Sequence, residues 1–433
     1  MNKLIQSVQA RTPFSYVWII VAIIFLILLS AAGIRATPSV MIMPLEHEFG
    51  WSLTTISFVI SVNIALYGLI GPFSAAAMQR YGIRPVVLGA LALLALGTFA
   101  STFMTMPWHM VLAWGLVVGA GSGVIANTLA ATIVGRWFET RRGLAMGLLT
   151  ASAATGQMVF LPLMAYMVEH FGWRSVAILV ATVAAIAIPL VALFLPERPQ
   201  DIGMKRYGQT DEMTADVAST ANPLKIAFTA LGKAVKVRDF WLLFFSFFIC
   251  GMSTNGYIGS HFIAMCGDHG MTPVAGASIL AMMGMLDLIG TTMSGWLSDR
   301  FNARVLLFWY YSLRGLALIF LPNAFDIMYF GLPLFAIFYG LDWIATVPPT
   351  VRLANDVFGR LAAPIVFGWI VAGHQLGAAS ATLLAGFLRH SLGSYTVASI
   401  LMGLACVIAA ILVLRIKGHH VDQSDAAATP ANS

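Results

Sequence analysis

The chain has few charged residues. Asp, Glu, Lys and Arg make up 10% of its 433 residues, while 59% of the residues are hydrophobic. A soluble protein carries roughly 25% charged residues, because its surface must be polar where it meets water. This composition excludes a soluble globular protein and predicts that most of the chain lies in lipid.

Cysteines and catalytic motifs are also scarce. The three cysteines, Cys250, Cys266 and Cys406, lie in apolar segments without the spacing of metal ligands. They predict neither a disulfide framework nor a metal site. The sequence contains no His-Glu-x-x-His, no nucleophile elbow and no Walker motif, so it does not indicate an enzyme or an ATP-driven pump. We expect no enzymatic activity, no cofactor and no bound metal.

What the chain does have is a series of long apolar runs. A hydrocarbon core about 30 Å thick needs about 20 apolar residues per helix, and twelve runs reach that length. The first run is too long for a signal peptide. Pro348 and Pro349 lack backbone donors and are expected to bend or end the tenth helix. The expected spans are 16–43, 53–77, 85–105, 108–134, 143–168, 173–195, 240–264, 274–298, 304–322, 327–349, 361–388 and 393–416.

One long polar stretch divides these runs into two sets of six. It covers residues 196–239 and contains seven Lys or Arg residues. The sequence therefore predicts an all-α membrane protein with two six-helix bundles. The expected parts are an N-terminal bundle (1–195), a cytoplasmic linker (196–239), a C-terminal bundle (240–416) and a disordered cytoplasmic tail (417–433).

The positions of the basic residues predict the topology. Lys and Arg are retained on the cytoplasmic side of a membrane. If both termini are cytoplasmic, only Arg174 and Arg389 fall in external loops, and Arg35 and Arg314 fall inside helices. That leaves 20 of the 24 basic residues in cytoplasmic segments. The net charge of +6 thus marks one face of a bacterial-type inner membrane, and we expect no nucleic-acid partner.

Two short turns, at 75–85 and 295–304, look like copies of one another. Each follows the second apolar run of its half, and each contains Arg-x-x-x-Arg. The positive-inside rule explains an arginine in such a turn, but it does not explain the matched spacing. Two repeated halves are expected to enclose a binding site at their interface. The aligned pairs are Gln79 with Asp299, Arg80 with Arg300 and Arg84 with Arg304.

The turn from Gly295 to Arg304 resembles the signature loop of the major facilitator superfamily. The resemblance implies a secondary transporter in which two halves rock about a central site. It also implies a cytoplasmic latch, made by the acidic residue and the arginines of the loop. In the first copy the neutral Gln79 replaces the acid and cannot anchor a charge-assisted network, so we expect the second copy to dominate. The implied latch residues are Arg80, Arg84, Asp299, Arg300 and Arg304.

A finer resemblance lies at the end of the first helix. The run from Pro44 to Trp51 resembles the monocarboxylate-transporter branch of the family and its bacterial relatives. The fourth helix fits the same group, because Gly115, Gly119 and Gly123 recur at the four-residue spacing that lets helices approach closely. The antiporter signature of drug exporters is missing from 143–168, which disfavours drug efflux.

Arg35 is the leading candidate for binding an anionic substrate. An ionisable side chain within a membrane helix costs several kcal/mol unless it is paired or hydrated, so it is a functional candidate. The guanidinium stays charged and presents a planar fork that suits a carboxylate. Alternatively, Arg35 extends to the outer interface or pairs with Glu46 or Glu48.

Three further ionisable residues, Asp287, Arg314 and Asp342, are expected near mid-depth. We predict that they form an ion-pair network in which an arriving proton breaks a pair and biases the access state. Alternatively, the charges neutralise each other permanently and lock helix packing. In the monocarboxylate branch an arginine follows the helix-eight acid by four residues, whereas here Thr291 occupies that position.

Polar and aromatic side chains complete the predicted substrate site. In lipid, neutral polar groups also hydrogen-bond between helices, at about 1 kcal/mol each, so that packing alternative remains for each of them. The lone histidine also has an alternative role in packing. The further residues predicted to contact substrate are Tyr67, Asn127, Gln157, Asn255, Tyr257, Trp343, His374 and Gln375.

The sequence as a whole predicts a monomeric transporter of a small organic anion, coupled to a proton. Two rivals stay open. One is a transporter of a neutral or aromatic metabolite, vitamin or drug, with Trp343, Trp369 and Tyr257 stacking on its ring. The other is a sensor or channel-like protein on the same scaffold. Substrate identity and direction of transport are not determined by the sequence.

Overall fold

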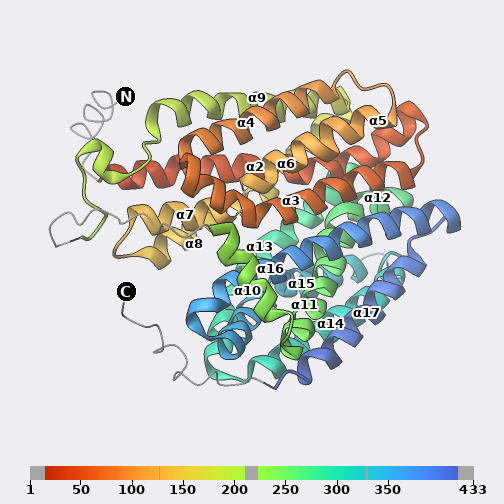
Figure 1. Ribbon diagram of the computed structural model, residues 1–433. Helices are drawn as coiled ribbons and strands as arrows, with labels where there is room; N and C mark the ends of the chain where they lie inside the picture. Colours follow the sequence, from red (N-terminus) through yellow and green to blue (C-terminus); the bar gives the residue numbers. More distant parts are fainter. Residues whose placement is uncertain (1–14, 126, 210–222, 328–329, 418–433) are drawn as a thin grey trace.

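Two bundles of α-helices lie against each other in the computed structural model (Figure 1). It describes residues 15–125, 127–209, 223–327 and 330–417. In these residues, eleven helices are long and apolar enough to cross a membrane. A further 30-residue helix, Arg142–Phe171, covers the remaining expected span at 143–168. The predicted all-α membrane fold is confirmed, while the tail predicted at 417–433 lies, except for Lys417, outside the described residues.

The N-terminal bundle follows the expected order of spans. Its fourth span is irregular, because a π-helical stretch (η1) precedes the Gly-rich segment and the backbone leaves helical geometry at Ile125. The elements are α2 (Tyr16–Phe49), α3 (Leu53–Tyr81), α4 (Ile83–Ser101), α5 (Pro107–Met110), η1 (Val111–Val118), α6 (Gly119–Val124), α7 (Asn127–Trp137), α8 (Arg142–Phe171) and α9 (Trp173–Phe194).

The C-terminal bundle also has irregular spans. A π-helical stretch (η3) interrupts the seventh span, and the long helix α16 contains a kink at Gly359, with φ 73°, that separates the tenth span from the eleventh. The elements are α11 (Arg238–Gly251), η3 (Met252–Ile258), α12 (Gly259–Asp268), α13 (Pro273–Arg300), α14 (Ala303–Ala324), α15 (Gly331–Asp342), α16 (Val347–Leu392) and α17 (Thr396–Leu414).

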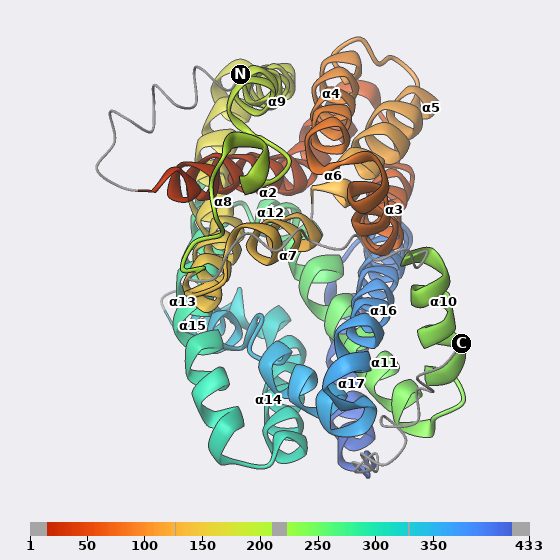
Figure 2. The ribbon, with the colours of Figure 1, turned by 60° about the vertical axis from the view of Figure 1, so that its left-hand side comes forward.

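The segment between the bundles is partly structured. A short 3-10 turn, η2 (Pro199–Ile202), follows α9. Tyr207 then pairs with Phe138 in an isolated parallel bridge, and its ring lies 5.6 Å from that of Trp18. A 12-residue helix, α10 (Pro223–Ala234), lies beside α16 and contacts both α3 and α16 (Figures 1 and 2).

Three helix pairs join the two bundles: α3 with α16, α8 with α13, and α2 with α12. We call the end that carries Arg84 and Arg304 the basic end. At the opposite end, Ser61 Oγ donates to the carbonyl of Ala379 at 2.7 Å. There α2 and α12 also meet closely, because a Cβ on Gly267 would lie 3.2 Å from the terminal carbon of Met43. The seam between the bundles is thus packed at the end opposite the basic turns.

Close packing of the fourth span depends on its glycines, as their spacing predicted. Gly115, Gly119 and Gly123 all face α3. A Cβ on Gly119 would lie 3.0 Å from the Cα of Asn63, and one on Gly123 would lie 3.1 Å from the Cα of Tyr67. The glycine stripe therefore holds the helix that carries Tyr67 close to the fourth span.

The tenth span is broken in the middle of its length. Helix α15 ends at Asp342, residues 343–346 form a turn, and α16 begins at Val347. The prolines expected to bend or end this helix, Pro348 and Pro349, instead begin its second segment, where the missing donors cost nothing. The break lies before them.

The two arginines expected in external loops each pair with an acid of their own bundle. Arg174 lies 2.5 Å from Glu48, which also accepts the indole N–H of Trp173 at 2.7 Å. Arg389 makes two bonds to Asp268, at 2.6 and 2.8 Å. Each pair ties the last turn of the first helix of its bundle to a later helix of the same bundle.

Candidate functional site

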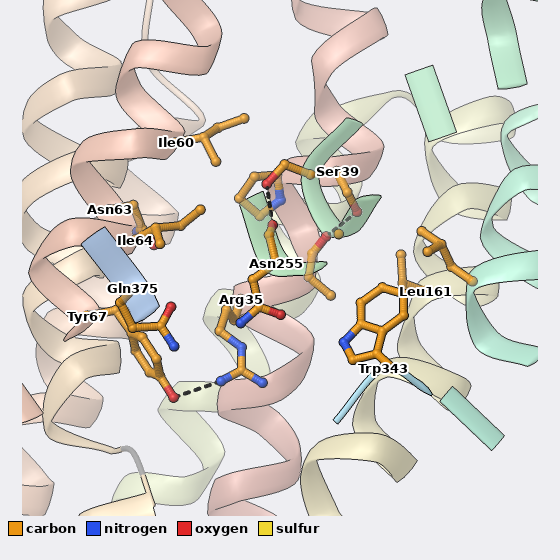
Figure 3. Close-up of a pocket in the computed structure, with 15 residues that line it drawn as sticks. Arg35, Ser39, Ile60, Asn63, Ile64, Tyr67, Leu161, Asn255, Trp343 and Gln375 are labelled. Atoms are coloured by element: carbon orange, nitrogen blue, oxygen red, sulfur yellow. Dashed lines mark hydrogen bonds between the residues drawn. The ribbon is translucent and has the colours of Figure 1, made fainter. Parts of the chain in front are cut away.

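Two adjoining chambers lie between the bundles, and Figure 3 shows the one that we call the distal chamber. It encloses ≈ 710 Å³, including its open mouth. The proximal chamber, nearer the basic end, encloses ≈ 990 Å³ counted in the same way. They share one set of wall residues, so they lie next to each other along the interface. The shared residues are Arg35, Tyr67, Asn255, Trp343 and Gln375.

Arg35 lies where the two chambers meet. Its guanidinium donates to the Tyr67 hydroxyl at 2.8 Å and lies 5.2 Å from the centre of that ring (Figure 3). The alternative pairing with Glu48 is not formed, because Glu48 is bound to Arg174. No described carboxylate lies within ion-pair distance of Arg35. Its positive charge therefore faces the cavity and is not directly paired with any carboxylate in the described part of the chain.

The distal chamber is apolar over about half of its wall. Besides the polar residues that it shares with the proximal chamber, its polar groups come from the side chains of Asn63, Ser39 and Ser260. Asn63 is held in place, because its amide nitrogen donates to the Trp114 carbonyl at 2.7 Å. Such a chamber suits the hydrocarbon part of a small molecule. Its apolar lining residues are Ala36, Pro38, Ile60, Ile64, Leu161, Leu280 and Trp343.

The proximal chamber contains a carboxylate, Asp287. This residue is 5% exposed, and its Oδ1 accepts the Thr291 hydroxyl at 2.8 Å and the backbone N–H of Ile344 at 2.8 Å. Ile344 lies in the break of the tenth span, so Asp287 satisfies one backbone donor that the break leaves free. No described residue donates to its other oxygen.

Arg314 and Asp342 form a buried ion pair that lines neither chamber. The Nε–Oδ2 distance is 2.7 Å, and the two side chains are 0% and 9% exposed. Arg314 also donates to the carbonyls of Asp342 and Trp343 and to the Cys250 sulfur at 3.0 Å. It thereby provides hydrogen-bond donors for backbone carbonyls at the break in the tenth span. The predicted three-residue network is thus divided, because Asp287 binds Ile344 and not Arg314.

The remaining predicted site residues have different outcomes. His374 lines the proximal chamber with its ring 4.7 Å from that of Phe247. Gln375 reaches the cavity beside Gly68. A Cβ atom added to Gly68 would lie 2.3 Å from the Cβ of Gln375. Tyr257 lines neither chamber, since it is fully buried and its hydroxyl bonds Ser399 at 2.5 Å. The side chains of Asn127 and Gln157 lie outside the described part of the chain.

The two motif turns form equivalent contacts in their bundles. Arg84 donates to the carbonyl of Ala192 at the end of α9, and Arg304 donates to that of Ile416 just beyond α17, at 2.9 Å. Each therefore ties the third span of its bundle to the sixth. Arg80 and Arg300 are exposed and lie over neighbouring rings, 5.4 Å from Tyr81 and 3.9 Å from Trp296.

An acidic residue at the first turn comes from an unexpected place. Glu197, just after α9, accepts the backbone N–H groups of Ile83 and Arg84 at 2.7 and 2.8 Å. It also lies 3.6 Å from Arg136. Asp299, at the second turn, is exposed and makes no ion pair with a described residue. In this conformation the charged contacts lie mainly at the first turn, opposite to our expectation.

Sequence reasoning missed several wall residues. Asn63 lies one helical turn before Tyr67 and therefore on the same face, which would have identified it. Cys250 and Thr346, whose side chains lie 3.2 Å apart, gave no comparable indication. In the described residues, no group of three or more His, Cys, Asp or Glu side chains is placed to hold a metal ion.

A twelve-span bundle with a polar cavity between two pseudo-symmetric halves defines a class of membrane transporter. The Major Facilitator Superfamily profile matches residues 23–350 and 267–431. The chain belongs to this superfamily, as the signature turn predicted.

Its relatives include monocarboxylate transporters and a bacterial MFS-type transporter. Monocarboxylate transporter 13 of Bos taurus is 25% identical over 390 residues, covering 89% of this chain and 86% of the relative. The MFS-type transporter YcxA of Bacillus subtilis is 24% identical over 418 residues, covering 92% and 95%. The xylose transporter XylE from E. coli shares the fold, with a TM-score of 0.69 at 14% identity over 93% of this chain and 98% of the other.

Proposed function

We propose that the protein carries a small organic anion together with a proton by alternating access. The observation that carries this proposal is the position of Arg35, which lies at the junction of two chambers between the bundles and forms no direct ion pair with a described carboxylate. A cation within a membrane span is costly unless an anion offsets its charge. The site therefore favours a substrate that supplies a negative charge.

The substrate's carboxylate would lie on the guanidinium of Arg35. Tyr67 occupies one nitrogen of the fork, fixing its orientation and leaving other donors for the substrate. Asn255 and Gln375, in the shared wall, offer amide groups to the polar end, and Trp343 and the apolar part of the distal chamber contact the carbon skeleton. The similarity to monocarboxylate transporters supports the same class of substrate.

Asp287 would carry the proton. With Arg35 charged and Asp287 ionised, the cavity is neutral, and an added anion would leave one uncompensated negative charge. Protonation of Asp287 removes that charge, so anion and proton bind more favourably together than either does alone. His374, in the same chamber, is a second group to which the proton can move. Arg314 and Asp342 would hold the broken helix rather than carry protons.

The orientation in the membrane is part of the proposal. The basic end would face the cytoplasm, because it carries most of the Lys and Arg residues, and both termini would then be cytoplasmic in an inner membrane. The chain would work as a monomer of two moving bodies, 1–195 and 240–416, joined by the linker 196–239. The motif turns would act as the cytoplasmic latch, with Glu197 supplying the acid that Gln79 lacks.

Uptake by vesicles containing the purified protein tests this function. The assay compares radiolabelled small monocarboxylates with matched amides and sugars, with and without an imposed pH gradient. We expect saturable uptake of a monocarboxylate that is stimulated by an acidic exterior. Uptake of neutral compounds alone would contradict the proposal that the substrate is an anion. Monocarboxylate uptake that does not depend on the pH gradient would contradict proton coupling.

A second candidate is a neutral or aromatic metabolite. The apolar part of the distal chamber and the ring of Trp343 favour it. In the same assay, an aromatic amide transported as well as its parent acid would show that the charge of Arg35 is not used for substrate recognition.

A further inference from the structure

Helix α10 has the composition of a membrane-surface helix. It is 12 residues long, which is too short to cross a membrane. The segment 223–238 contains four basic residues and no acidic one. All four basic side chains are exposed, and none forms an ion pair with a described residue. They are Lys225, Lys233, Lys236 and Arg238.

Large apolar side chains on the same helix are also exposed. Leu224, Ile226 and Phe228 are 38%, 42% and 52% exposed, although the side of α10 at Ala234 is buried against the C-terminal bundle. Apolar exposure of this extent is unfavourable in water. It is expected of a helix that lies in the interface plane, with its apolar residues among acyl chains and its lysines at the headgroups.

The place of α10 in the bundle agrees with this depth. Its Phe228 ring lies 5.9 Å from Phe73 of α3 and 5.5 Å from Trp369 of α16. Phe73 precedes the end of α3 by eight residues, which is about 12 Å along the helix axis. The helix therefore lies slightly inside the basic end, at a level that suits the boundary between headgroups and acyl chains if the basic end faces the cytoplasm.

These contacts also cross the seam between the bundles. Phe228 lies between a ring of the N-terminal bundle and a ring of the C-terminal bundle, and the Trp369 indole donates to the Ala227 carbonyl at 3.1 Å. Separation of α3 from α16 at this end would break at least one of these contacts. Whatever holds α10 in place therefore favours the conformation in which the contacts are formed.

We propose that α10 is a binding surface for acidic phospholipids, and that bound lipid stabilises the seam between α3 and α16. The partner is the anionic headgroup layer of the surrounding leaflet, which complements four basic side chains that form no ion pair with any described residue. The headgroup phosphates bind the lysines while the neighbouring acyl chains cover Leu224 and Phe228. This role is additional to the proposed transport and does not depend on the substrate.

Hydrogen exchange of the full-length protein in nanodiscs tests the proposal. One set of discs contains only phosphatidylcholine, and the other contains added phosphatidylglycerol. We expect the amides of α10 to exchange at least about tenfold more slowly with phosphatidylglycerol, since each basic residue adds to the attraction, and high salt should abolish the difference. Equal exchange in the two lipids would overturn the proposal, and this comparison needs no variant.

A charge-removal pair makes the test specific. The variant K225Q/K233Q/K236Q should lose the protection given by phosphatidylglycerol. The control R198Q/K205Q/R415Q removes three exposed charges elsewhere near the basic end and should keep it. If both variants lose the protection equally, total charge and not α10 attracts the lipid, and the proposed site is wrong. Because exchange and not uptake is measured, the result is independent of the proposed transport.

Discussion

The carboxylate of Asp287 accepts the backbone N–H of Ile344 at 2.8 Å, so a side chain in the cavity is bonded directly to the break in the tenth span. A proton that binds Asp287 changes the strength of this bond, because a neutral carboxyl is a weaker acceptor than a carboxylate. A change of charge in the cavity is thereby linked to the backbone of a helix that lies against it.

Asp287→Asn should uncouple transport from protons. The amide oxygen of Asn can still accept the Ile344 N–H, so we expect folding to be retained. For one-proton symport, each unit of pH gradient changes the accumulation ratio about tenfold. In the variant this dependence should disappear, while exchange of labelled for unlabelled substrate continues. Vesicle uptake at several imposed gradients measures it, and an unchanged pH response would exclude Asp287 as the proton site.

Arg35→Gln should weaken anion binding. The variant loses a charge-assisted hydrogen bond, and we expect the half-saturation concentration to rise by roughly 10- to 100-fold. Arg35→Lys keeps the positive charge but loses the planar guanidinium fork, so its half-saturation concentration should lie between those of the wild type and Arg35→Gln. Arg174→Gln is the matched control, because Arg174 lies outside the cavity, at the end of the bundle opposite the basic end, where it pairs with Glu48. Normal uptake by Arg35→Gln would remove the proposed role.

Arg314→Met and Asp342→Leu should each destabilise the fold. Removing one partner of a buried ion pair leaves the other charge uncompensated, which costs about 3–5 kcal/mol. The double variant should lose less than the sum of the two single losses. Thermal unfolding in detergent, compared across the three variants, measures this. Additive losses would mean that the two residues act independently.

Glu197→Gln should loosen the first motif turn. It weakens the bonds to the first N–H groups of α4 and the pairing with Arg136, and a helix cap of this kind contributes about 1 kcal/mol. Asp299→Asn, which makes no ion pair with a described residue, should change stability by less than about 0.5 kcal/mol. Unfolding midpoints of the two variants test the difference. If the two variants lower the unfolding midpoint equally, Asp299 stabilises the second turn as much as Glu197 stabilises the first.

The parts of the fold that follow from local composition were predictable. The length of the apolar runs predicted the spans, the polar stretch 196–239 predicted the two bundles, and the repeated turns predicted the family. Arg35 and Tyr67 were identified as cavity residues because a charged or polar group in a membrane helix is costly unless it faces water or a partner.

The parts that depend on how helices are rotated against each other were not predictable. Tyr257 and Asn255 are two residues apart, so helix periodicity places them on different faces, but the sequence does not show which of the two faces the cavity; in the structure it is Asn255. The break at 343–346 contains no proline that would have indicated it. It is stabilised by Arg314 of a different helix, which donates to the carbonyls of Asp342 and Trp343. Glu197 reaches the first turn because the end of α9 packs beside the start of α4, a tertiary contact that the sequence does not show.

The paired ties made by Arg84 and Arg304 have a mechanical consequence. Each arginine fastens the start of a bundle's third span to the end of its sixth, so the first and second triplets of helices within a bundle are joined at the same level. Flexing inside either bundle is thereby resisted. Displacement is then concentrated at the interface between the bundles, so each bundle moves as a rigid body.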